Sequence, residues 1–216
     1  MTLKVVGPRA FELVKLMSEF SGLPLELKGG HVDFSADGLM APFESQTLQT
    51  LIKDCIKTHN SLRLTAFGGH VKVHNLDPRY PNPWGDSFGN VTSFHIPDRS
   101  VYVHDLKEIA KGSPSAGRIL LGHILKEYLG GSLPPGMGHS HNYRPVHNAA
   151  IPTEAKIAHD LTGRAIWSGG SKPSERTMPT TSGLVNIRSY GPSLTYEFHF
   201  DAALTFKSVK PPHGIR

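Results

Sequence analysis

Hydrophobic residues recur with helical spacing in four parts of the chain. Residues typical of helix starts and ends agree with these helices. Pro8 and Pro152 suit first helical positions, Ser45 is a typical N-cap, and Gly22 and Gly163 are typical of helix ends. The predicted helices cover residues 8–22, 45–60, 117–131 and 152–163.

Elsewhere hydrophobic and polar residues alternate, which predicts short strands. The Gly29-Gly30 pair between two of them is typical of a hairpin turn, and the last three read as an antiparallel meander. The predicted strands are residues 23–27, 31–35, 62–65, 71–73, 91–96, 100–103, 184–189, 194–200 and 204–209. The polar, Pro/Gly-rich stretch 168–181 predicts a flexible loop.

Together these elements predict one α+β domain spanning residues 1–216, with a small, mostly antiparallel sheet. No apolar run approaches the ~20 residues needed to cross a bilayer, and no signal peptide is recognisable. A cytoplasmic location, or export by a non-classical route, is therefore expected. The single cysteine, Cys55, excludes an intramolecular disulfide and favours a reducing compartment.

The formal net charge of +5 is spread along the chain without a block of lysine and arginine. Neither a nucleic acid nor a membrane is therefore indicated as a partner. Thirteen histidines are a large number for 216 residues, and imidazole is the commonest metal ligand in proteins. The histidines are therefore the first candidates for metal-binding or catalytic residues.

The helix predicted over residues 117–131 is apolar on nearly every side, which is typical of a buried central helix. It nevertheless contains His123 and Glu127, which lie one turn apart on the same face. An uncompensated buried carboxylate costs several kcal/mol, so Glu127 must be paired, hydrogen-bonded, protonated or metal-bound. Glu154, on the apolar stripe of the following helix, is a second acid that faces apolar surroundings.

Residues 123–130 read His-Ile-Leu-Lys-Glu-Tyr-Leu-Gly, which resembles the His-Glu-x-x-His motif of the zincin metallopeptidases. The first histidine and the glycine of the elongated motif are kept, whereas Glu127 replaces the second histidine and Ile124 replaces the general base. The elongated third-ligand position holds Leu133. The surroundings, with a strand pair before and an acid-bearing helix after, resemble the zincin-like domains of bacterial toxins and effectors.

The resemblance implies a zinc-dependent, peptidase-like hydrolase acting on a protein or peptide. The expected zinc ligands are His123, Glu127 and one of three downstream histidines, namely His139, His141 and His147. Zinc would lower the pKa of a bound water toward ~7. Glu154 is the candidate general base or a further ligand, and Tyr143 or Arg144 could stabilise an oxyanion.

Other interpretations stay open at this point. His123 and Glu127 could form a structural pair in the core without a metal. The chain could be a non-catalytic interaction module on a zincin-like scaffold, consistent with Ile124 in the base position. A metal-free, histidine-dependent nuclease of the toxin type is the third alternative.

Overall fold

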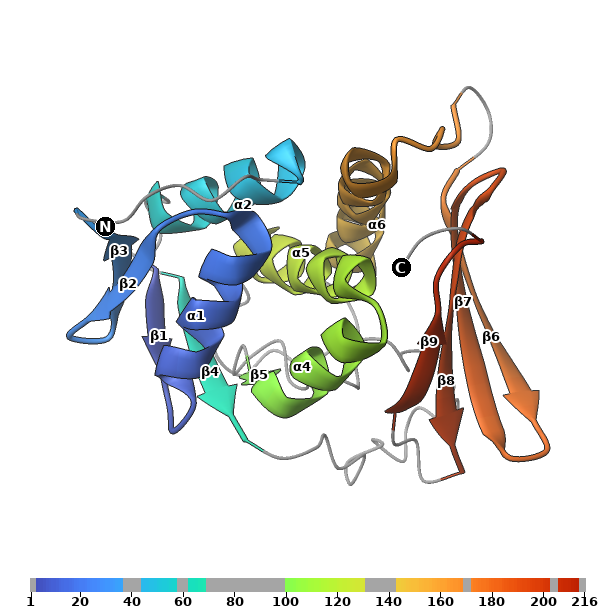
Figure 1. Cartoon of the computed structure of the whole chain (residues 1–216), viewed down its shortest axis with the longest axis horizontal. Coiled ribbons are helices and arrows are strands. Elements are labelled where there is room, and N and C mark those ends of the chain that lie inside the picture. The colour runs from blue at the N-terminus through green and yellow to red at the C-terminus, as the bar shows by residue number, and fades with distance from the viewer. Residues whose placement is uncertain are drawn as a thin grey trace.

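The computed structural model describes residues 3–36, 44–57, 62–68, 100–130, 143–168, 172–202 and 206–213. It confirms the α+β class: helices lie between a five-stranded sheet, here sheet A, and a four-stranded sheet, here sheet B (Figure 1). Among the helices it describes, none is long and apolar enough to cross a membrane.

Sheet A is mixed. Its strands are β1 (Lys4–Val6), β2 (Leu25–Lys28), β3 (His31–Phe34), β4 (Arg63–Phe67) and β5 (Ser100–Tyr102), in the order β2-β3-β1-β4-β5. The β2–β3 hairpin turns at Gly29 and Gly30, both with positive φ, as predicted. β1 pairs antiparallel with β3 but parallel with β4, and β4 and β5 are also parallel. The strands expected at 71–73 and 91–96 lie outside the described residues.

The helices are α1 (Ala10–Ser21), α2 (Gln46–Lys57), α4 (Val103–Gly112), α5 (Pro114–Gly130) and α6 (Tyr143–Thr162). α1 ends at Ser21 and is capped by Gly22 with φ 71°, the left-handed conformation that glycine adopts without a Cβ penalty. α5 is central, as predicted, with apolar side chains buried on nearly all sides. Gly122 keeps it close to α6, because a Cβ there would lie 2.1 Å from Ile157 Cδ1.

Four expectations about elements differ from the structure, and the first difference is that strand β1 was not predicted. α4 was not predicted, and the strand expected over 100–103 gives way to this helix at Val103. α6 begins at Tyr143 and not at Pro152, which lies exposed inside it. The helix continues through this proline because its buried face, including Ala150, Ala155 and Ile157, packs in the protein interior. The loop expected over 168–181 contains strand β6 (Ser174–Thr180).

Sheet B is an antiparallel meander of β6, β7 (Gly183–Gly191), β8 (Leu194–Asp201) and β9 (Phe206–Lys210), which confirms the three predicted closing strands. Alternate residues of β8 are buried. Tyr196 belongs to this buried set, and its hydroxyl donates to Ser115 Oγ of α5 at 2.9 Å. Sheet B therefore presents one face to the helices, and this face contributes to the site described below.

Asp160, near the end of α6, caps the start of α2. The Ser45 hydroxyl and the Thr47 backbone N–H both donate to Asp160 Oδ2 at 2.8 Å. Ser45 is the N-cap of α2, as predicted. Its hydroxyl oxygen accepts a hydrogen bond from the Leu48 N–H at 3.1 Å. One carboxylate therefore stabilises the positive end of a helix that is distant in sequence.

We predict that Asp160→Ala lowers the free energy of unfolding by about 1 kcal/mol, the usual effect of losing an N-cap. Urea unfolding followed by circular dichroism measures it. Asp54→Ala is the matched control, because Asp54 is an exposed acid within α2. An equal loss of stability in both variants would show that charge, and not capping, is responsible.

Candidate functional site

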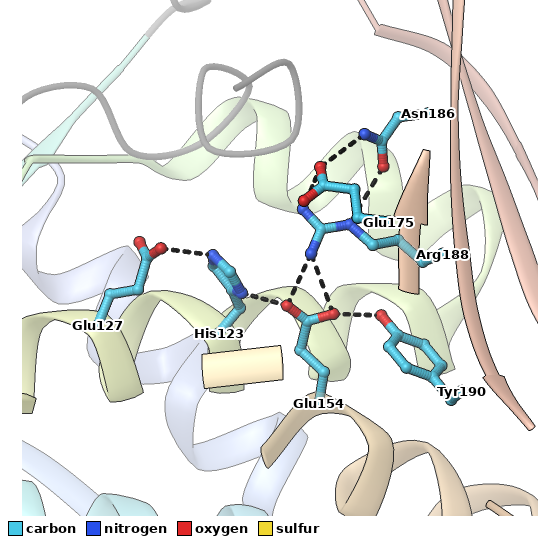
Figure 2. A network of polar contacts seen from close by, with 7 residues as sticks. All are labelled: His123, Glu127, Glu154, Glu175, Asn186, Arg188 and Tyr190. Carbon is cyan, nitrogen blue, oxygen red and sulfur yellow. Dashed lines mark hydrogen bonds and ion pairs between the residues drawn. The ribbon is translucent and has the colours of Figure 1, made fainter. Parts of the chain in front are cut away.

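His123 lies between two carboxylates in the interior of the protein (Figure 2). Its Nε2 atom is 2.8 Å from Glu127 Oε1, and its Nδ1 atom contacts Glu154 Oε1. α5 supplies His123 and Glu127 one turn apart, and α6 supplies Glu154. All three side chains are at most 1% exposed. The sequence prediction that His123 and Glu127 are neighbours, with Glu154 a further buried acid, agrees with this geometry.

Glu154 has two further partners, both from strand β7. Arg188 NH1 donates to both of its carboxylate oxygens, at 3.0 and 3.4 Å, and the Tyr190 hydroxyl donates to Oε2. Arg188 and Tyr190 are fully buried. Glu154 therefore joins helix α5 to sheet B through contacts with an imidazole, a guanidinium and a phenol.

The outer end of the network lies on sheet B. Arg188 NH2 donates to Glu175 Oε1 at 2.8 Å, and Arg188 Nε donates to Asn186 Oδ1 at 3.1 Å. Asn186 Nδ2 also donates to Glu175 Oε1, at 2.7 Å. The Glu175 side chain is 14% exposed, so the network reaches solvent only at this end among the residues drawn in Figure 2.

The four innermost charges of this network balance without an added ion, whereas Glu175 leaves the network as a whole with one net negative charge. A protonated His123 and Arg188 offset the carboxylates of Glu127 and Glu154, and Glu175 is the one member in contact with solvent. This balance matters because an unpaired charge in the interior costs several kcal/mol.

The carboxylates decide the protonation state of His123. Burial opposes the charged imidazole, but Glu127 and Glu154 outweigh burial and raise the pKa of His123 to about 10. Burial likewise opposes the charged form of Glu154, but Arg188 and His123 outweigh it and lower the pKa of Glu154. Burial and then the Glu154 carboxylate raise the pKa of Tyr190, so its hydroxyl remains a donor. A carboxylate held in this way is a weak base.

The other predicted site residues are placed less fully. Tyr143, Arg144 and His147 lie in the first turns of α6, where the structure describes the backbone but not these side chains. His139 and His141 lie outside the described residues. Their expected roles as zinc ligands or oxyanion donors stay predictions.

His123, Glu127 and Glu154 do not by themselves converge on one zinc ion, and the expected ligand set of His123, Glu127 and a downstream histidine stays a prediction because those histidine side chains are not described. Glu127 and Glu154 contact opposite ring nitrogens of His123, so the two carboxylates and the imidazole do not converge on one point. Within the described ranges no group of three or more histidine, cysteine, aspartate or glutamate side chains could hold a metal ion. Arg188 against Glu154 also repels a cation on that side.

Sequence reasoning missed Arg188, Tyr190, Glu175 and Asn186. A signal for part of this set was present, because the alternation in β7 places Asn186, Arg188 and Tyr190 on the same face. An arginine on the core-facing side of a strand requires a buried acid as its partner. Comparisons with known protein families, curated proteins and solved structures found no match for this chain.

We predict that alkaline pH destabilises the protein through His123. Because its folded pKa, about 10, exceeds the unfolded value near 6.5, its contribution is complete below pH ~6.5 and is lost as pH rises to about 10. The expected slope is at most about 1.4 kcal/mol per pH unit. Urea unfolding from pH 6 to 10 measures it, and His123→Gln should flatten the dependence. An equally steep dependence in that variant would contradict the assignment.

We also predict that Arg188→Met destabilises the fold by about 3–5 kcal/mol, because it leaves buried carboxylates without their guanidinium. Arg176→Met is the matched control on the neighbouring strand, where the side chain is exposed. The double variant Glu154→Gln/Arg188→Met should recover part of the loss. Equal unfolding midpoints for Arg188→Met and Arg176→Met would refute this role.

Proposed function

We propose that this chain is a non-catalytic interaction module on an α+β scaffold, in which a protonated His123 takes the place of the metal expected from the zincin-like motif. One observation carries the proposal: each ring nitrogen of the buried His123 contacts a carboxylate, and Arg188 completes the charge balance. The contact between Nε2 and Glu127 is an ion pair that lacks hydrogen-bond geometry, so on this side the network depends on charge balance. A network whose buried charges balance in this way stabilises the scaffold without a metal.

Competition between a proton and a metal supports the same conclusion. Zinc binds neutral imidazole, so it would have to displace a proton from His123, whose pKa is about 10. At neutral pH this competition weakens zinc binding.

The groups needed to activate water are also poorly placed. Ile124, at the position of the zincin base, is fully buried in the apolar core. Glu154, the other candidate base, has a lowered pKa. Its carboxylate is paired with His123 and accepts hydrogen bonds from Arg188 and Tyr190. A base must be able to take a proton from substrate or water, and this carboxylate is committed to its three partners.

Zinc content and peptide cleavage test the proposal. After equilibration with zinc at pH 7.5 and removal of free metal, we expect no stoichiometric zinc, no thermal stabilisation by zinc and no cleavage of a broad peptide library. Glu127→Gln should move the alkaline loss of stability to lower pH, because it removes one of the two carboxylates that favour the charged imidazole.

One zinc per chain, lost in Glu127→Gln, together with cleavage by the wild type, would overturn the proposal. Glu19→Gln is the matched control, because Glu19 is an exposed acid on α1. It should change neither zinc content nor the pH dependence of stability.

A zinc-dependent hydrolase remains a second candidate, and one observation favours it. Glu154 contacts Nδ1 of His123, which is the position of the carboxylate that orients a metal-bound histidine in many metal sites. Nε2 and Glu127 would then be ligands, with a further donor from His139 or His141. Zinc affinity that rises about tenfold per pH unit from 7 to 9 and falls in His139→Ala/His141→Ala would support this candidate.

A further inference from the structure

The face of sheet A that points away from the core combines cations with an aromatic pair. Buried residues of the strands, such as Val5, Val32 and Leu64, form the face against the helices, and the alternate residues form the opposite face. We call this opposite face the outer face of sheet A. It comprises Lys4, Val6, Glu26, Lys28, His31, Asp33, Arg63, Thr65, Phe67 and Tyr102.

Strand register places four basic side chains in one row across the outer face. Lys28 pairs with His31, His31 with Lys4, and Lys4 with Arg63. Directly paired residues share a face and have Cβ atoms about 5 Å apart. The row therefore crosses four adjacent strands, although its members come from residues 4 to 63 of the sequence.

Two cations of this row are available to a ligand. Lys4 and Arg63 are exposed, and neither forms an ion pair with any acid that the structure describes. Lys28, by contrast, is 2.6 Å from Glu26. The acids of the outer face, Glu26 and Asp33, lie on β2 and β3, so the half formed by β1, β4 and β5 is purely basic among its described residues.

Aromatic side chains follow on the same half of the face. Phe67 and Tyr102 are paired across β4 and β5, with ring centroids 5.8 Å apart and planes 30° from parallel. Both are partly exposed. Arg63 and Phe67 lie four residues apart on β4, which is about 13 Å along a strand. The positive charges and the aromatic rings thus lie at different positions along the same face of the sheet.

We propose that the outer face of sheet A binds single-stranded nucleic acid. Lys4 and Arg63 neutralise phosphates, and Phe67 and Tyr102 provide a platform on which unpaired bases stack. Stacking on side chains requires bases that are not already paired, so the Phe67–Tyr102 pair favours a single strand over a duplex. This inference would give the proposed interaction module a partner, but it involves neither His123 nor its partners, so the oligonucleotide tests and the zinc tests can fail separately.

Fluorescence anisotropy with labelled 15-nucleotide oligo-dT and oligo-rU tests the cations. We expect binding at low salt that Lys4→Ala/Arg63→Ala weakens at least tenfold. The slope of log K against log salt should become shallower by about 1.4, since each phosphate contact on a single strand contributes about 0.7. Lys156→Ala/Lys172→Ala removes the same charge from exposed positions elsewhere and should leave both quantities nearly unchanged.

Phe67→Leu tests stacking separately from charge. It keeps an apolar side chain at this partly buried position but removes the ring, and we expect affinity to fall about fivefold or more with an unchanged salt slope. The thermal melting midpoint checks that the variant remains folded. If Phe67→Leu does not fold, Tyr102→Leu gives the same comparison on β5.

Several outcomes would overturn the proposal. These are the failure of the wild type to bind either oligonucleotide at low salt, an equal loss in the Lys156/Lys172 control, and tighter binding of duplex than of single strands. Binding to phosphatidylserine vesicles without binding to oligonucleotides would instead assign the face to an anionic membrane surface.

Discussion

The buried ion pair between Arg188 and Glu154 is the interaction on which the arrangement of helices and sheet B depends. Both side chains are fully buried, and they come from a strand and a helix that are separated in sequence. Desolvating two charges is offset only when their geometry is good and their remaining hydrogen-bonding capacity is used. Asn186, Glu175, Tyr190 and His123 use that capacity. The position of sheet B against α6 is therefore specified by polar contacts as well as by apolar packing.

His123 connects this buried ion pair to helix α5. It contacts Glu154 on one side and Glu127 on the other, so a proton on the ring offsets charge that Arg188 alone leaves uncompensated. The same residue types can bind a metal when their donor atoms converge, and here they lie on opposite edges of a ring. From this placement we propose a structural network in place of a metal centre. Outside the network, the outer face of sheet A offers a surface of different chemistry.

Sequence patterns predicted the buried polar pair and the second acid, because His123, Glu127 and Glu154 interrupt stripes that are otherwise apolar. They could not identify Arg188 as the partner of Glu154, because that pairing depends on how sheet B packs on α6. Local rules also placed the start of the acid-bearing helix at Pro152, whereas tertiary packing extends α6 back to Tyr143. Strand β6 was missed because its polar and exposed residues resemble a loop, and only pairing with β7 makes it a strand.

The protonation state of the His123 ring is the central claim, and nitrogen-15 NMR of the histidine side chains measures it directly. With the full chain at pH 8 and in the presence of zinc, both ring nitrogens of His123 should show the shifts of a protonated imidazolium and should titrate only near pH 10. The His123→Gln variant identifies the signal. A neutral ring at pH 8, with Nδ1 protonated and Nε2 shifted by zinc, would contradict the account and indicate a metal centre.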